Sequence, residues 1–228
     1  GIRDTSVTGV QTCALPIYGR RRAYTVWLLV LCMFAHGLTF TAVPLLLPLI
    51  RPALGMSFTD AGLLTAAATL SYALGQIPAG LLADRFGPRR PFFAGLMGWS
   101  GLTLAFACLN SFSLAVACLF VAGAFRAMMF APGLSLLASW YPSERRATAM
   151  SLYMVGGFGG QIALALIAPL IAGAYGWRIA LISLALPGVI GAFAFRALAA
   201  DAPRRKAATP LAWADVVRVA CSPVMWLC

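Results

Sequence analysis

The chain has 228 residues, of which 61% are hydrophobic and only 10% are charged. Soluble domains carry about a quarter charged residues, so six acidic residues in so apolar a chain argue against a soluble protein and favour a membrane protein. The net charge of +11 does not indicate nucleic-acid binding, because the basic residues fall in short clusters between long apolar runs.

Residues 1–17 differ in character from the rest of the chain. The stretch VTGVQTCALPI, Val7 to Ile17, resembles the translation of a sequencing-library adapter. It has neither the apolar region nor the small-residue cleavage site of a signal peptide, so we exclude residues 1–17 from the fold as non-native. Cys13 then carries no meaning. The remaining cysteines show no metal-ligand spacing, and neither a metal nor a cofactor is predicted.

Six runs in the chain are long and apolar enough to cross a bilayer. A helix that crosses about 30 Å of hydrocarbon needs about 20 mainly apolar residues. The runs cover 24–50, 60–82, 91–110, 113–139, 147–174 and 178–198. Gly and Pro occur inside several of them, and neighbouring helices in a bundle satisfy the backbone groups that they free. The sequence predicts an all-α membrane protein with a six-helix transmembrane bundle over residues 24–198.

Basic residues are distributed unequally between the two sides of this bundle. Twelve fall on one side: Arg20, Arg21 and Arg22, then Arg85, Arg89 and Arg90, then Arg145 and Arg146, then Arg196, Arg204, Arg205 and Lys206. Arg51 and Arg178 fall on the other. The side rich in Lys and Arg is cytoplasmic, so both ends of the bundle, residues 18–23 and 199–222, are predicted to lie in the cytoplasm. A bacterial inner membrane is expected.

The two ends of the chain suggest a fragment. Residues 199–222 form a polar central loop, and residues 223–228 begin an apolar run that stops at once. We expect the last six residues to be the truncated start of a seventh helix.

A motif lies between the second and third runs. GLLADRFGPRR, Gly80 to Arg90, fits the pattern G-x-x-x-D-R-x-G-x-R-R at every specified position. A single Arg lies in the fourth run, a basic loop WYPSERRATAMS follows it, and GWR opens the sixth run. With these features, residues 24–228 resemble the N-terminal half of the major facilitator superfamily. The resemblance implies a twelve-helix transporter in two six-helix halves, each built from two inverted three-helix repeats, with the substrate between the halves. A C-terminal half is then the expected partner.

The same resemblance implies a cytoplasmic gating motif that latches the two halves together. Gly80 and Asp84 share a helix face, where the glycine admits another helix and the carboxylate meets a helix N-terminus. Arg85 and Arg89 also share a face and are placed to pair with a carboxylate such as Glu144. The predicted motif residues are Gly80, Asp84, Arg85, Gly87, Arg89, Arg90 and Glu144.

Four polar side chains lie at one depth in the apolar runs: Arg126, His36, Tyr72 and Gln161. A charge at mid-membrane costs at least about 2.5 kcal/mol and usually faces a cavity or a partner. We interpret the four as a substrate-binding site. The alternatives are a core histidine bonded to a carbonyl for His36, and helix–helix hydrogen bonds for Tyr72 and Gln161. For Arg126 the alternative is a bond to carbonyls of neighbouring helices or a pair with an acidic residue of the other half.

No run carries a carboxylate in its central part, so a cavity with Arg126 should favour anions. The predicted function is secondary transport of a small solute, an organic anion, by alternating access. Coupling to protons or ions is left open. A carboxylate that carries the coupling proton would lie in the other half, or else His36 would carry that proton. A solute sensor and an exporter of hydrophobic compounds are the alternatives, although the fifth run lacks the Gly-Pro pattern of drug–proton antiporters. An enzyme is rejected, because an intramembrane serine protease needs G-x-S-G and a late His, and neither is present.

Overall fold

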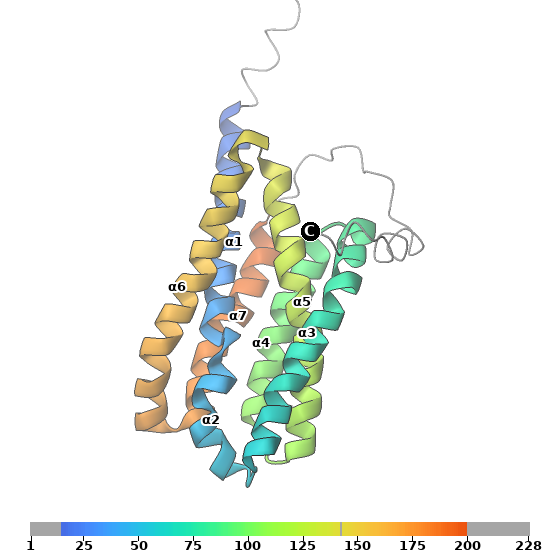
Figure 1. The fold of residues 1–228 in the computed structure, drawn as a ribbon. Helices are drawn as coiled ribbons and strands as arrows, with labels where there is room; N and C mark the ends of the chain where they lie inside the picture. Colours follow the sequence, from blue (N-terminus) through green and yellow to red (C-terminus); the bar gives the residue numbers. More distant parts are fainter. Residues whose placement is uncertain (1–14, 142, 200–228) are drawn as a thin grey trace, which may run out of the picture.

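The computed structural model describes residues 15–141 and 143–199, with only the backbone for residues 15–22, 143 and 144. These residues form seven α-helices in one bundle (Figure 1): α1 Leu15–Phe40, α2 Ala42–Ala53, α3 Phe58–Phe86, α4 Arg89–Ala107, α5 Phe112–Trp140, α6 Ser143–Tyr175 and α7 Trp177–Leu198. Of the excluded segment 1–17, residues 1–14 lie outside the described part of the chain, and α1 begins at Leu15. The predicted loop, from residue 200 on, and the predicted seventh helix also lie outside the described residues.

The first run differs from the single helix predicted over residues 24–50. Helix α1 ends at Phe40 and α2 begins at Ala42. Pro44 has no backbone N–H, so it cannot bond the carbonyl of Phe40, and the helix breaks there. The backbone N–H of Leu45 instead donates to the carbonyl of Thr41 at 2.9 Å and starts the new helix. The run predicted as one helix is therefore two helices, which meet at Thr41.

The helices pair in a pattern that relates the first half of the bundle to the second. Helix α3 packs mainly on α5, α1 on α6 and α7, and α4 on α5 and α7. Exchanging α1 with α5, α3 with α6 and α4 with α7 leaves this set of pairs unchanged. A bundle made of two inverted three-helix repeats has this exchange symmetry.

Two apolar clusters fill the bundle, one towards each end. One gathers Leu46, Ile50, Phe106 and Trp177 around α2, and the other gathers Phe92, Leu137, Tyr153 and Phe195. Between them lies a layer with buried polar side chains, which include His36, Thr39, Ser71, Ser100 and Thr103. A polar layer at mid-height in an apolar bundle marks where a solute site is to be sought.

The outer surface of the bundle suits a bilayer. Large apolar side chains are exposed along α3 and α6, among them Leu70, Leu74, Ile162 and Leu166. Within the described residues, five helical segments are long and apolar enough to cross a membrane: Ala23–Ala53, Phe58–Phe86, Phe112–Trp140, Arg145–Tyr175 and Trp177–Leu198. Helix α4, which starts with two arginines, is not among these five segments, but it packs between α5 and α7 inside the bundle.

The connections place the charged residues at the ends of the helices. At one end, Ser57 caps α3 in a reciprocal pair of hydrogen bonds with Asp60, which explains that carboxylate without a further role. Arg178 lies at the same end and donates to the carbonyl of Ala107 at 3.1 Å. Arg85, Arg89 and Arg145 lie at the opposite end, in the last turn of α3 and the first turns of α4 and α6 (Figure 1).

Candidate solute-binding site

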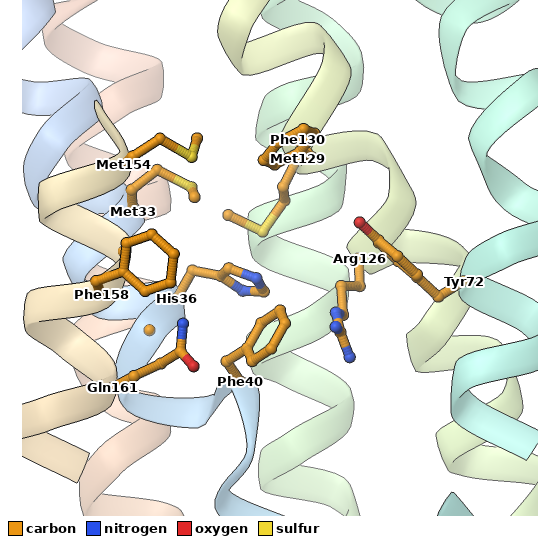
Figure 2. A pocket seen from close by; sticks show the side chains of 12 residues that line it. Met33, His36, Phe40, Tyr72, Arg126, Met129, Phe130, Met154, Phe158 and Gln161 are labelled. Carbon is orange, nitrogen blue, oxygen red and sulfur yellow. The ribbon is translucent and has the colours of Figure 1, made fainter. Parts of the chain in front are cut away.

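A cavity of about 220 Å³ lies in the middle of the bundle, between α1, α3, α5 and α6. Its lining includes all four polar residues singled out in the sequence: His36, Tyr72, Arg126 and Gln161. They come from four different helices, and Figure 2 shows His36 extending inwards from one wall and Arg126 on the facing wall, with its guanidinium beside the ring of Phe40. Complete ligand pockets measure roughly 300–1,000 Å³, so this cavity is smaller than most of them and suits only a small solute.

The guanidinium of Arg126 is surrounded by aromatic rings. Its central carbon lies 3.8 Å from the ring centre of Phe40, 4.4 Å from that of Tyr72 and 5.6 Å from that of Trp99. Such contacts attract a cation to the negative face of a ring. The Nε atom is buried and has no hydrogen-bond partner within the described residues. Aromatic faces hold the charge in place and leave its hydrogen bonds unused.

Small residues bring α3 close to α5 beside Arg126. A Cβ atom on Gly123 would lie 3.1 Å from the backbone N of Tyr72, and one on Gly75 would lie 2.9 Å from the Cβ of Ala127. Both distances are too short for a larger side chain to fit without a shift of the neighbouring helix. The two glycines therefore set the helix separation that places Tyr72 against Arg126.

A second pair of glycines brings α1 close to α6. A Cβ atom on Gly37 would lie 2.9 Å from the Cα of Gly160, and the reverse distance is the same. Gly156 contacts the carbonyl of Val30 one turn away, where a Cβ would lie at 2.6 Å. This close helix contact follows the small-residue pattern of membrane helices. It places His36 and Gln161, the neighbours of these glycines, side by side on the cavity wall.

His36 is only 5% exposed, and its Nδ1 atom has no hydrogen-bond partner among the described residues. The ring meets Phe40 and Trp99 edge to face, at 5.5 and 5.7 Å between centroids. Nδ1 of His36 therefore makes no bond to a described carbonyl. An unpaired polar atom on a cavity wall is available to a solute.

Trp99 supports the site from behind. Its indole N–H donates to the hydroxyl of Thr39 at 2.7 Å, and that hydroxyl donates to the carbonyl of His36 at 3.0 Å. This chain joins α4 to the last turn of α1, just before the break. It fixes the segment that carries both His36 and Phe40.

Several lining residues gave no signal in the sequence. Three methionines and three phenylalanines complete the wall: Met33, Met129, Met154, Phe40, Phe130 and Phe158. An apolar side chain in an apolar helix looks the same whether it faces lipid, a neighbouring helix or a cavity. A lone polar residue in such a helix does stand out, which is why the sequence identified the polar part of the lining and missed the rest.

The predicted gating motif lies at the end of α3 and the start of α4. Gly87 adopts a φ of 79° and ends α3, a conformation that favours glycine. Arg89 donates to the carbonyl of Arg196 at 3.0 Å and so ties α4 to the end of α7. Asp84, Arg85 and Arg90 are exposed.

Two parts of the latch hypothesis remain untested within this chain. No described atom lies within 4 Å of a Cβ placed on Gly80, so the described bundle has no helix packed against it. The side chain of Glu144 lies outside the described residues. Its predicted pairing with Arg85 or Arg89 stays a prediction.

Comparison with known proteins places this bundle in a family. The sequence profile of the Major Facilitator Superfamily matches residues 29–228. A D-galactonate transporter of Escherichia coli O6:H1 (strain CFT073) is 31% identical over 122 residues, which cover 54% of this chain and 28% of that protein. A probable galactarate/D-glucarate transporter of E. coli K12 is 33% identical over 106 residues, covering 44% and 24%. A quinolone resistance transporter of Acinetobacter baumannii is 28% identical over 130 residues, covering 53% and 29%.

The fold has a close counterpart among solved structures. A bacterial homologue of the human lysosomal transporter Spinster, in an inward-facing and occupied conformation, superposes with a TM-score of 0.73 at 20% identity. The match covers 90% of this chain and 49% of that one, so the chain spans about half of a solved transporter. It matches less than a third of the length of each of the three relatives named above. This integral membrane bundle has the architecture of one transporter half, and the chain belongs to the Major Facilitator Superfamily.

Proposed function

We propose that this chain forms one half of a secondary transporter for a small organic anion, with Arg126 as the group that binds the anion. Arg126 carries the proposal because it lies at the midpoint of α5, on a cavity, with unused hydrogen-bond donors. A second six-helix half supplies the opposite wall, and both ends of this half face the cytoplasm of a bacterium. Alternating access moves the solute across the inner membrane.

The charges of the described wall support an anion. The acidic side chains described are Asp60 and Asp84, near opposite ends of α3, whereas Tyr72 lies at its midpoint beside Arg126. Twelve residues of helix separate each carboxylate from Tyr72, or about 18 Å along the axis. Neither carboxylate neutralises Arg126, so the guanidinium remains available to a carboxylate of the solute.

The energetics are consistent with an arginine that has no ionic partner. A charge at mid-membrane costs at least about 2.5 kcal/mol. A desolvated cation–π contact contributes about 2 kcal/mol, and three rings lie within reach of Arg126. The rings therefore offset much of this cost without occupying the N–H groups. Two of the relatives are named as sugar-acid transporters, which agrees with an anionic substrate.

Efflux of hydrophobic compounds is the second candidate. The apolar lining of the cavity favours it, and one relative is named a quinolone resistance transporter. An exporter of this kind does not require a negative charge on its substrate. The two functions are separated by asking whether binding depends on charge.

The test compares anions with neutral analogues in the purified full-length transporter. We expect D-galactonate or benzoate to bind more tightly than D-galactose or benzamide. Arg126→Ala should lower anion affinity roughly 10- to 100-fold, because hydrogen bonds to a charged group contribute about 1.5–3 kcal/mol. Arg126→Lys keeps the charge but loses the fork, so it should be milder.

Membrane insertion of both variants is the control, measured by the yield of monodisperse protein in detergent. Wild-type anion affinity in Arg126→Ala, or loss of folding in both variants, would assign Arg126 to structure. Equal binding of anions and neutral analogues by the unsubstituted transporter would favour the efflux function.

A further inference from the structure

The cavity has an apolar side as well as a polar one. Met33, Met129, Phe130 and Met154 gather on one side of it, and Arg126 and Gln161 lie towards the other (Figure 2). The chain direction of α1, α5 and α6 places the methionines nearer to the arginine-rich end of the bundle. Met33 and Met129 are buried, at 6% and 1% exposure, so they are part of the wall rather than of the lipid-facing surface.

We infer that the solute is a compact monocarboxylate with an apolar, aromatic body, whose carboxylate lies on Arg126 and whose ring lies among the methionines. This inference rests on the proposed function, since it uses Arg126 as the anion-binding group. Methionine side chains are flexible and polarizable, and they contact aromatic rings favourably. Phe40, Phe130 and Phe158 add ring faces and edges around the same space.

A polyhydroxylated acid fits this wall poorly. Each hydroxyl that leaves water needs a hydrogen-bond partner in the site. With Arg126 engaged by the carboxylate, the wall offers three polar side chains, His36, Tyr72 and Gln161, and of these the Tyr72 hydroxyl points towards the side on which the methionines gather (Figure 2). A hexonate such as D-galactonate carries five hydroxyls along its whole length. The site of this chain therefore differs in substrate class from those of the relatives named for sugar acids.

The experiment measures the affinities of the full-length transporter for benzoate and D-galactonate, two probes with the same single negative charge. We expect benzoate to bind at least about ten-fold more tightly. Met154→Gln adds an amide to the apolar side and should weaken benzoate binding about five-fold or more, because the amide loses its water when the ring is bound. Met150→Gln is the matched control: it lies one turn earlier on α6, is half-buried like Met154 and does not line the cavity. It should leave both affinities unchanged.

The outcomes of these binding measurements distinguish this inference from the function on which it rests. If D-galactonate binds as tightly as benzoate or more tightly, and Arg126→Ala abolishes that binding, the apolar-body inference is wrong and the anion site stands. If Arg126→Ala binds benzoate with wild-type affinity, the proposed function fails as well. Equal effects of Met154→Gln and Met150→Gln on benzoate affinity would also overturn the inference, since they would show a change in stability rather than in the cavity.

Discussion

Among the described residues, Arg126 is held at mid-height in the bundle by aromatic faces rather than by a carboxylate. A carboxylate would have fixed the guanidinium more strongly, but it would also have competed with an anionic solute for the same N–H groups. Phe40 and Tyr72 contact the cation through their ring faces, at 3.8 and 4.4 Å. Rings accept no conventional hydrogen bonds, so the contact stabilises the charge and preserves its donors.

The contribution of these rings is open to a double-mutant cycle. Phe40→Leu keeps an apolar side chain but removes the ring face, and we expect it to lower the free energy of unfolding by about 1–2 kcal/mol more in the wild-type background than in Arg126→Ala. Tyr72→Phe keeps its ring face and should behave like the wild type. Thermal unfolding in detergent measures all of these. If Phe40→Leu lowers the free energy of unfolding equally in both backgrounds, the ring of Phe40 does not stabilise the charge of Arg126.

At this scale the sequence was informative about polar residues only. His36, Tyr72, Arg126 and Gln161 were identifiable because each interrupts an apolar run near its middle, and the structure brings them to one cavity. Trp99 was not identifiable, although its indole supports both His36 and Thr39. Membrane helices are apolar on all faces, so their periodicity does not distinguish inward from outward residues. Whether the four residues bind a solute stays a prediction.

Helix contacts in this bundle depend on glycines at specific heights. Gly37 and Gly160 let α1 and α6 touch through backbone, and Gly75 and Gly123 do the same for α3 and α5. One contact joins the two helices of the wall that carries His36 and Gln161, and the other joins the two helices of the wall that carries Tyr72 and Arg126. By contrast, a Cβ atom added to Gly173 of α6 would meet no described atom within 4 Å, so this glycine serves no such contact.

The contrast between two glycines of α6 tests this. Gly160→Ala should destabilise the bundle by about 1–3 kcal/mol, because the added methyl meets the backbone of α1. Gly173→Ala should be neutral or slightly stabilising, since alanine favours the helix and the space is open. Melting temperatures of the two variants decide the matter. Equal shifts would show that helix propensity, not the α1–α6 contact, governs the effect.

The elements themselves were largely visible in the sequence, and the break in the first run was not. Length and hydropathy predicted a helix over residues 24–50, and Pro44 was expected to be accommodated within it. The structure ends α1 at Phe40 instead. A proline in a run has two outcomes, a kink or a break, and tertiary contacts decide between them. Here the bond between Trp99 and Thr39 holds the end of α1 from outside the run.

The whole bundle has chemically different ends. Exposed arginines follow α3 and precede the body of α6 at one end, and the capped start of α3 lies at the other. This agrees with the charge asymmetry of the sequence, which predicts that the arginine-rich end faces the cytoplasm. The orientation determines which side of the membrane the methionine side of the cavity faces.

Single cysteines report that orientation. In a cysteine-free background, a cysteine at position 57 should react with an impermeant thiol reagent added outside intact cells, because Ser57 lies at the exposed start of α3. A cysteine at position 143, at the start of α6, should react only after the membrane is permeabilised. The reverse pattern would invert the topology.

The role of the exposed Asp84 depends on the complete transporter, which includes the second half. Since the described bundle gives its carboxylate no partner helix, we expect it to meet a helix end of the other half. Asp84→Asn should reduce transport about ten-fold or more without affecting membrane insertion. Asp60→Asn, on the same helix at the opposite end, is the control and should transport normally, because the amide oxygen of asparagine still accepts the hydrogen bond from the backbone N–H of Ser57. Unchanged uptake by Asp84→Asn at equal expression would contradict the proposed contact between Asp84 and the other half.

Trp99 makes the molecule its own optical reporter. Its indole lies 5.6 Å from the guanidinium of Arg126 and is only 4% exposed, so the field of that charge is less screened at the ring than it would be in water. An anion that docks on Arg126 cancels much of that field at the ring. The emission wavelength of this tryptophan should therefore shift when the cavity fills, so that occupancy is readable by fluorescence without any added label.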